Sequence, residues 1–283
     1  KMANLIILIS KAVACMKRVD GVFELESSLR DGSDLKPAGA EKQSGPMVEF
    51  KRVSFSYGET QSEVLTDLSF CAMKGQTVGV IGGTGSGKST LVNLIPRFYD
   101  VGKGMVLVDG RDVKDYSMKE LRSIIGVVPQ KAVLFKGSLK DNMRWGKADA
   151  SDEEIWEALE IAQAKEVAEK KGQGLEFMID QGGRNLSGGQ KQRLTIARAL
   201  VRDPEILIMD DSASALDFAT DAKLRMAIQK DTKDMTVFIV SQRATTIRHA
   251  DQIVVLDDGA AVGIGTHEEL FESCEVYREI CLS

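Results

Sequence analysis

The sequence lacks the features that mark several classes of protein. Its 37 Lys and Arg residues are outnumbered by 42 Asp and Glu, which gives a net charge of −5. The basic surface that nucleic-acid-binding proteins use is therefore not indicated, and we expect no nucleic-acid partner. The four cysteines are scattered and show no C-x-x-C spacing. That pattern favours reduced thiols of a cytosolic protein over a disulfide framework or a zinc site.

A long hydrophobic run is also missing. The apolar residues 3–9 fall far short of the roughly 20 that a membrane-spanning helix needs. Lys11, Lys17 and Arg18 follow this run, whereas a secretory signal peptide carries its charges before it. The order fits the cytoplasmic end of a membrane helix and fits an ordinary amphipathic helix equally well. Because the sequence starts at Lys1, we expect an excerpt or a processed product.

The composition divides the chain into unequal parts. With 283 residues, 43% of them hydrophobic and 28% charged, it is typical of a globular protein with one sizeable domain or two small ones. Ser, Gly, Pro and charged residues gather between positions 25 and 46, which is a linker composition. We therefore expect a short N-terminal segment (residues 1–20), a linker (21–46) and a folded domain (47–283).

The most informative stretch is a glycine-rich loop, here called the phosphate loop. It fits the pattern G-x-x-x-x-G-K-[ST] and consists of Gly82, Gly83, Thr84, Gly85, Ser86, Gly87, Lys88, Ser89 and Thr90. An apolar run at 77–81 predicts a buried strand before it, and residues 89–95 predict a helix after it. Glycines let backbone amides converge on phosphate oxygens, and the helix start adds its own amides. Lys88 would supply a cation and Ser89 a magnesium ligand. The alternative is an ordinary glycine turn before a helix.

Strand patterns flank this loop on both sides. Alternating apolar residues predict a strand from 48 to 55, followed by a second strand at 64–73 and a third at 104–110 that closes in an Asp-Gly turn. Tyr57 follows the first strand. Its ring can stack on a nucleobase, or it can simply pack at a strand end.

Polar side chains follow several predicted buried strands. Gln130 comes after the strand at 124–128, while Asp210 and Asp211 end the strand at 206–210. Ligands of open α/β sheets bind at the carboxyl ends of the strands. There the Gln130 oxygen would complete a magnesium shell, and Asp210 would hold the metal's waters. Strands alternate with helices through most of the chain, which predicts a parallel α/β sheet.

Residues 131–201 are mostly of helical character and predict an insertion into this sheet. Ser151 followed by Glu154 is a capping-box signal for one helix. Another helix opens with Leu186, Ser187, Gly188, Gly189 and Gln190, here called the signature segment. Glycines and a serine at a helix start form a second anion site or an ordinary serine N-cap.

Taken in order, these motifs closely resemble the ATP-binding domain of ABC transporters, over about residues 47–283. Leu134, Phe135 and residues 138–142 after Gln130 are similar to the exporter type. Residues 1–20 resemble the cytoplasmic end of an exporter's last membrane helix. The resemblance implies an α/β fold of the P-loop NTPase (RecA-like) kind, with a parallel core, an antiparallel β subdomain and a helical subdomain at about 131–200 that carries the signature segment.

The resemblance also implies cofactors, partners and residue roles. ATP and Mg²⁺ would lie between the phosphate loop of one chain and the signature segment of another in a head-to-tail dimer. Tyr57 would stack on adenine, Ser89 and Gln130 would ligate magnesium, and Asp210 would hold its waters. Ser214, Ala215, Leu216 and Asp217 correspond to the family's D-loop. Residues 130–142 would meet a transmembrane domain at the cytoplasmic face of the cell (inner) membrane, the fragment itself being soluble or peripheral.

Two residues depart from the family pattern. Asp211 stands where a catalytic glutamate is usual, and Gln242 where a histidine contacts the terminal phosphate; Gln181, where exporters often have a glutamate, carries less weight. The aspartate is one methylene shorter, which withdraws its carboxylate by roughly 1 Å. We therefore expect an ATPase of low activity in isolation, contributing the degenerate site of a heterodimeric exporter. The alternatives are a soluble import ATPase subunit and a nonhydrolytic ATP-dependent regulatory module.

Overall fold

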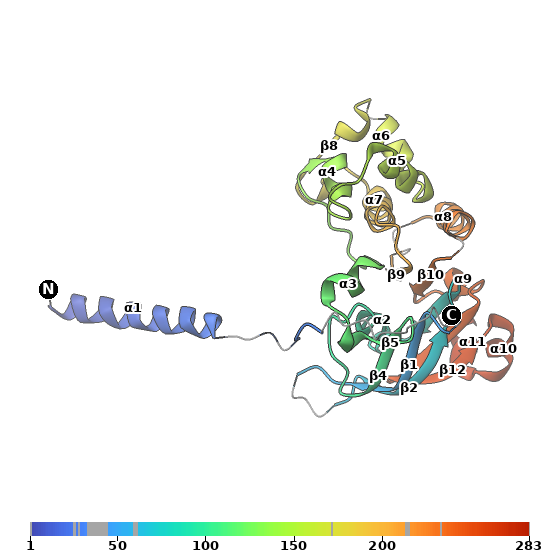
Figure 1. The fold of residues 1–283 in the computed structure, drawn as a ribbon, viewed down its shortest axis with the longest axis horizontal. Coiled ribbons are helices and arrows are strands. Elements are labelled where there is room, and N and C mark those ends of the chain that lie inside the picture. The colour runs from blue at the N-terminus through green and yellow to red at the C-terminus, as the bar shows by residue number, and fades with distance from the viewer. Residues whose placement is uncertain are drawn as a thin grey trace. The chain divides into compact units, whose positions relative to one another are not determined.

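The computed structural model describes residues 2–24, 27, 29–32, 45–58, 62–170, 172–212, 216–232 and 234–282 (Figure 1). The chain divides into two compact units, Lys1–Asp31 and Gly32–Ser283. The N-terminal unit contains helix α1 (Met2–Phe23), none of whose residues is buried. Among the described residues, no helix combines the length and the apolar character needed to cross a membrane.

A six-stranded sheet forms the centre of the larger unit. Its strand order is β12-β11-β3-β10-β9-β6, and all neighbours are parallel except β12, which runs antiparallel to β11. The strands are β3 (Thr77–Gly82), β6 (Ile125–Val128), β9 (Ile206–Asp210), β10 (Thr236–Val240), β11 (Gln252–Asp257) and β12 (Ala260–Gly265). The predicted parallel α/β core is confirmed.

Residues of β9 alternate between two hydrophobic cores, because successive side chains of a strand point to opposite faces. Ile206 and Ile208 belong to one core, which also contains residues of the second sheet and of α2 (Lys88–Leu94). Leu207 and Met209 belong to the other, where they meet the helices of the insertion. Both faces of the central sheet are thus covered, which explains its unbroken apolar strands.

The second sheet is antiparallel, with the order β2-β1-β4-β5. Its strands are β1 (Val48–Phe55), β2 (Leu65–Ala72), β4 (Lys103–Val108) and β5 (Arg111–Asp112). Asp109 and Gly110 join β4 to β5 with φ values of +48° and +74°, as expected of an Asp-Gly turn. The short helices η1 (Val113–Asp115) and α3 (Met118–Ser123) follow. The antiparallel β subdomain is therefore present.

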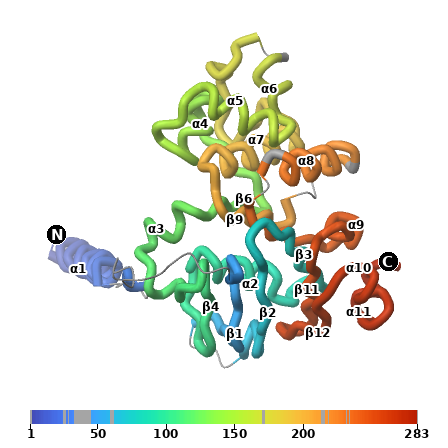
Figure 2. Tube along the Cα trace, turned by 45° about the vertical axis from the view of Figure 1, so that its right-hand side comes forward, coloured from blue at the N-terminus to red at the C-terminus, as the bar shows by residue number. Residues whose placement is uncertain are grey.

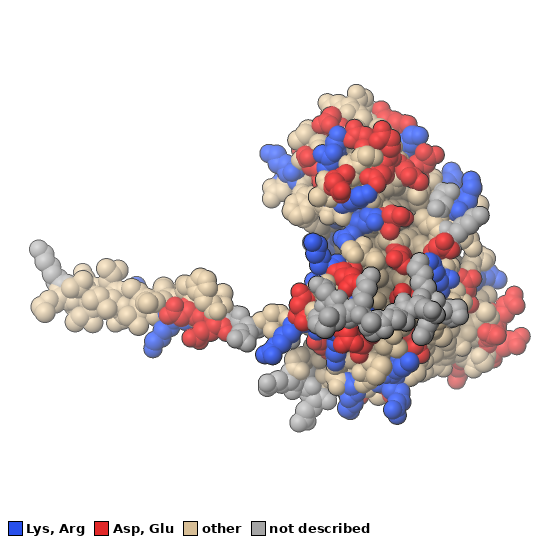
Figure 3. All heavy atoms as spheres, viewed as in Figure 1, with Lys and Arg blue, Asp and Glu red and all other residues tan. Residues whose placement is uncertain are grey.

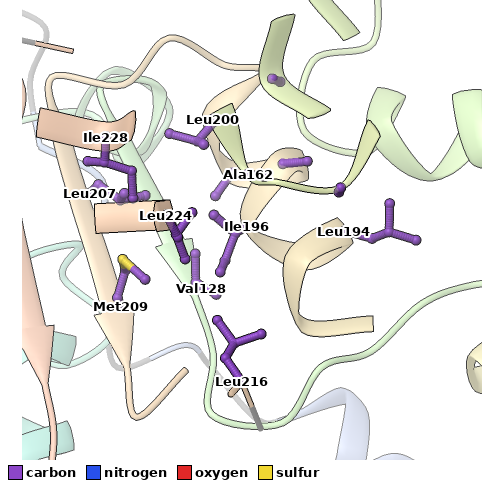
Figure 4. Close-up of a cluster of buried hydrophobic side chains, with 14 of the residues drawn as sticks. Val128, Ala162, Leu194, Ile196, Leu200, Leu207, Met209, Leu216, Leu224 and Ile228 are labelled. Carbon is purple, nitrogen blue, oxygen red and sulfur yellow. The ribbon is translucent and has the colours of Figure 1, made fainter. Parts of the chain in front are cut away.

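The insertion packs its helices above the β6 and β9 edge of the central sheet (Figure 2). Figure 4 shows Leu194 and Ile196 of α7 (Gly188–Leu200) in the cluster that also holds Leu207 and Met209 of β9. The insertion and the segment after β9 contain α4 (Leu139–Arg144), α5 (Asp152–Ile161), α6 (Lys165–Lys170), η2 (Gly174–Glu176), η3 (Gln181–Gly183), α7 (Gly188–Leu200) and α8 (Phe218–Asp231). Short strands β7 (Gly137–Ser138) and β8 (Met178–Ile179) pair within it, a feature that the mostly helical sequence pattern did not predict.

Side-chain caps fix several helix starts. Ser151 and Glu154 form the predicted capping box of α5, and Thr266 with Glu269 forms another at α10 (His267–Ser273). The remaining helices of the larger unit are α9 (Ala244–Ile247) and α11 (Glu275–Leu282). On the face drawn in Figure 3, Lys and Arg are interspersed with Asp and Glu, so a basic patch does not form there.

Candidate nucleotide-binding site

The phosphate loop joins β3 to α2 with a backbone that only glycine accommodates at two points. Gly87, the N-cap of α2, has φ +94°, and a Cβ on it would lie 2.6 Å from Leu65 Cδ2. A Cβ on Gly82 would lie 2.1 Å from the carbonyl oxygen of Leu256. Glycine at these positions allows the loop to pass close to its neighbours and to run directly into the start of α2, where anions bind.

Lys88 lies folded against this loop. Its Nζ donates to the carbonyl oxygens of Gly82 at 2.9 Å and Gly83 at 2.5 Å, and the residue is only 8% exposed. Burial lowers the pKa of the Lys88 ammonium, while the charges of Asp211 and Asp210 oppose that shift. The ammonium is therefore held at the loop by the two carbonyl oxygens.

Ser89 and Asp210 connect α2 to the end of β9. The Ser89 hydroxyl donates to Asp210 Oδ1 at 2.9 Å. The pKa of Asp210 is raised, chiefly because the carboxyl is buried and also because of the nearby charge of Asp211. The hydrogen bond from Ser89 and the charge of Lys88 oppose this shift. A hydroxyl and a carboxylate at hydrogen-bond distance, with the Gln130 amide lining the same cavity, are oxygen donors of the kind that Mg²⁺ prefers. The residues present thus fit a magnesium ion.

Asp211 is tied to two other strand ends. Its backbone is in the left-handed region, with φ +43°, and its amide donates to the Val240 carbonyl at 3.0 Å. Gln130 Nε2 donates to Asp211 Oδ2 at 3.2 Å. The residue after the strand-end aspartate therefore has a defined side-chain position, set partly by the glutamine that follows β6.

These groups line one cavity of about 270 Å³. The predicted residues that it brings together are Thr84, Gly85, Gly87, Lys88, Ser89, Thr90, Gln130, Asp210, Asp211 and Gln242. Gly82, Gly83 and Ser86 are outside the lining, although Lys88 contacts all three. The structure adds Val64, Val240 and Ser241. Ser241 stands next to Gln242 after β10 and was within reach of the same strand-end argument, whereas Val64 carries no signal in the sequence.

Tyr57 lies beside the cavity rather than in its lining. Its hydroxyl shares a 2.9 Å hydrogen bond with Thr90 Oγ1, which lines the cavity. Its ring stands nearly perpendicular to the rings of Phe55 and Tyr99, at 87° and 88°. Sequence reasoning missed Tyr99, because it follows α2 and only the fold brings it to β1.

The signature segment lies outside this cavity, on the helical insertion. Ser187 is the N-cap of α7; its Oγ accepts from the Gln190 amide, and Gln190 Oε1 accepts from the Ser187 amide at 3.0 Å. The serine N-cap weighed for this segment is thus present. Leu186 is buried, while Ser187 and Gly188 are exposed. Gly189 is the second residue of α7.

The D-loop residues divide between described and undescribed parts of the chain. Ser214 and Ala215 lie outside the described residues. Leu216 is buried, and Asp217 caps α8 by accepting from the Thr220 amide at 2.9 Å and its hydroxyl at 2.8 Å. Gln181, in η3, is exposed.

Residues 65–214 match the family described as ABC transporter. The chain is 44% identical over 276 residues to an uncharacterized ABC transporter ATP-binding protein, YfiB of Bacillus subtilis, covering 98% of this chain and 47% of that protein. It is 41% identical over 272 residues to a putative multidrug export ATP-binding/permease protein, YgaD of the same organism, covering 96% and 46%. A solved bacterial Atm1-family ABC exporter with ATP bound is similar with a TM-score of 0.87 and 32% identity, covering 96% of this chain and 47% of that one. The chain spans about half the length of these relatives.

Proposed function

Because this chain belongs to the ABC transporter family, we propose that it is the ATP-binding domain of an exporter half-transporter whose own site holds MgATP and hydrolyses it slowly. The observation that carries the proposal is that one cavity combines a complete phosphate loop with Asp211 and Gln242. The phosphate loop supports tight MgATP binding, whereas Asp211 and Gln242 support only slow hydrolysis.

The binding half of the proposal rests on the phosphate loop and its neighbours. Loop amides and the α2 start receive the phosphate oxygens, and Lys88 supplies a cation at the outer phosphates. Ser89 and Gln130 would hold magnesium, and Asp210 would hold its waters. The metal would neutralise charge on the phosphates.

The hydrolytic half rests on Asp211 and Gln242. A general base must reach the proton of the attacking water within hydrogen-bond distance. The Asp211 carboxylate is roughly 1 Å shorter in reach than a glutamate, a displacement that costs about a hundredfold in rate, and it already accepts a hydrogen bond from Gln130. Gln242 lines the cavity but has no cationic form to contact the terminal phosphate. Both deficits slow the same step.

A heterodimer reconciles this weak site with an intact signature segment. The segment's Ser187 and Gly188 are exposed at the start of α7, where backbone amides favour an anion. We infer that it completes the ATP site of a second half-transporter that carries glutamate and histidine at the altered positions. This chain's phosphate loop then retains ATP while the other site turns over.

The exporter assignment draws support from two further regions. The rings of Phe135 and Trp145 lie against each other with centroids 4.8 Å apart and planes inclined by 33°. The two residues are 45% and 67% exposed, which suits contact with a membrane domain's cytoplasmic loops. Helix α1 carries exposed apolar residues throughout its length, as expected at the end of a membrane helix. Exporters among the relatives bear names such as putative multidrug export protein. We place the domain at the cytoplasmic face of the cell (inner) membrane.

The nonhydrolytic regulatory module is the second candidate function, because Asp211 and Gln242 favour binding without cleavage. A soluble import ATPase subunit is a third, and the exposed apolar helix α1 speaks against it.

Separate measurements of MgATP binding and turnover on the chain test the proposal. We expect MgATP binding that Lys88→Ala weakens by about tenfold or more, since charge-assisted hydrogen bonds to phosphate are lost. Turnover should be low in both proteins. Rapid turnover by the chain alone, abolished by Asp211→Ala, would make it an efficient ATPase and refute the slow site.

A further inference from the structure

Three aromatic rings form a closed cluster beside the nucleotide cavity. Phe55 ends β1, Tyr57 follows it, and Tyr99 comes from the segment after α2. The ring centroids lie 4.8 Å apart for Phe55 and Tyr57, 5.1 Å for Tyr57 and Tyr99, and 5.6 Å for Phe55 and Tyr99. Every ring of the cluster therefore contacts the other two.

The cluster is not an ordinary piece of core. Phe55 is 4% exposed, whereas Tyr57 and Tyr99 are 39% and 41% exposed. Neither Phe55 nor Tyr99 stacks parallel to Tyr57, because both rings are nearly perpendicular to it. Offset-parallel stacking is favourable for aromatic pairs. Neither neighbouring ring stacks on Tyr57 in this way, whereas a nucleobase could.

The backbone around Tyr99 is anchored from several sides. Arg97 Nε donates to Asp100 Oδ1 at 2.7 Å, and Arg97 is only 4% exposed. Arg122 donates from Nε to the Pro96 carbonyl at 3.1 Å and from Nη2 to the Arg97 carbonyl at 2.9 Å. Tyr99 is thus presented by a well-braced turn.

The Tyr57 hydroxyl adds a link to the phosphate loop. It shares a 2.9 Å hydrogen bond with Thr90 Oγ1, whose residue belongs to α2 and lines the cavity. The ring of Tyr57 is therefore held at its hydroxyl by the loop helix and at its sides by Phe55 and Tyr99.

We propose that Tyr99 is a positioning residue for nucleobase recognition, which holds the Tyr57 ring in the orientation that receives the base. The inference rests on the proposed function, because it takes ATP as the ligand. Tyr99 acts through Tyr57 and makes no contribution to the phosphate contacts. The affinity for the nucleobase therefore depends on Tyr99, a residue of the turn after α2.

Equilibrium binding to the purified chain tests this role with two probes, MgATP and magnesium tripolyphosphate, which lacks the base. We expect Tyr99→Ala to weaken MgATP binding about threefold to tenfold, the range given by one aromatic pair, and to leave tripolyphosphate binding unchanged. Tyr99→Phe keeps the ring and should bind MgATP like the unaltered protein. In a Tyr57→Ala background, Tyr99→Ala should cause no further loss, because the ring that it positions is gone.

Equal weakening of both probes would overturn the proposal, because it would mean that Tyr99 supports the loop rather than the base. Unchanged MgATP binding by Tyr99→Ala, a loss with Tyr99→Phe as large as with alanine, or additive losses with Tyr57→Ala would overturn it too. If the unaltered chain bound tripolyphosphate but not MgATP, or neither, the proposed function itself would fail. Normal MgATP binding with no effect of Tyr99→Ala would remove only this inference.

Discussion

Asp211 has a side-chain position that its neighbours define, and this bears on what the residue can do. Its amide is bound to Val240 and its carboxylate accepts from Gln130 Nε2 at 3.2 Å. The carboxylate thus has a fixed partner on the β6 side, and its short side chain limits its reach toward a terminal phosphate. Gln242 shares the cavity without offering a positive charge.

Introducing the family's usual glutamate and histidine at positions 211 and 242 should speed ATP hydrolysis at this site. We predict that Asp211→Glu combined with Gln242→His raises ATP turnover at this site about a hundredfold, the factor attached to roughly 1 Å of misplacement of a reacting group. Single-turnover hydrolysis in the full-length assembly measures it, with MgATP affinity as the control. Preserved ATP binding without a rate gain would mean that something other than these two residues limits hydrolysis.

We expect the buried carboxylate of Asp210, to which we assign the waters of a magnesium ion, to reduce the stability of the folded protein. Burial raises its pKa, so the folded state holds a proton more tightly than the unfolded state does. Stability from this group therefore falls as the pH rises from the unfolded pKa through the raised folded pKa, and stays reduced above it. In EDTA, we predict that Asp210→Asn raises the unfolding temperature at pH 7, and that the gain shrinks as the pH falls toward 4.

Asp217→Asn is the matched control, for which we expect a change in unfolding temperature of the opposite sign. Hydrogen bonds from Thr220 lower the pKa of Asp217, so its stabilisation is present above the unfolded pKa and is lost as the pH falls through the lowered folded pKa. Asp217→Asn should unfold at a lower temperature than the unaltered protein at pH 7, and the difference between their unfolding temperatures should become smaller as the pH falls. Equal shifts of the same sign in both variants would contradict the assignment of burial as the main cause at Asp210.

The sequence predicted which residues gather at the site but not how they bind one another. Lys88, Ser89, Gln130 and Asp210 were placed together because parallel strands end at one edge. The bond between Tyr57 and Thr90 and the Tyr99 ring were not predicted, since these depend on how the antiparallel sheet packs against α2. Local patterns carry no information on that packing.

At the scale of elements, helix caps were the most reliable signals. Ser151 caps a helix as predicted, because a capping box satisfies orphan amides within four residues of chain. Helix α3 begins at Met118 because the Ser117 side chain caps it. The β7 and β8 pair was missed because its partners, Gly137–Ser138 and Met178–Ile179, are distant in sequence.

Two capping boxes of the insertion provide a matched experiment on the signature segment. Ser187 caps α7 and Ser151 caps α5, each paired with the third residue of its helix. We predict that Ser187→Ala and Ser151→Ala each lower the free energy of unfolding by about 1 kcal/mol. In the assembled transporter, only Ser187→Ala should reduce ATP turnover, by about tenfold or more, as expected for a lost hydrogen bond to a charged group.

Urea unfolding and steady-state ATPase assays of the same preparations separate the two effects. Equal turnover in the Ser187→Ala and Ser151→Ala assemblies would contradict a role of the signature segment at the partner's site.

At the scale of the whole molecule, ATP binding and ATP cleavage are separate capacities in the proposed function. In the proposed function, the phosphate loop and Lys88 bind ATP in this chain, while the signature segment on α7 acts at the ATP site of a second subunit. Two copies of this chain would pair two slow sites, so we propose an unlike second subunit. The fold class followed from the order of strands, helices and motifs.

The most direct measurement is the fate of ATP on this chain during turnover of the full-length assembly. A photoreactive ATP analogue labelled on both the base and the γ-phosphate, added with magnesium, reports whether nucleotide on each subunit is intact. We predict that this chain retains intact ATP through many turnovers while the partner carries hydrolysed nucleotide. Loss of γ-phosphate from this chain at the same rate as from its partner, or an active assembly of two copies of this chain, would contradict the account.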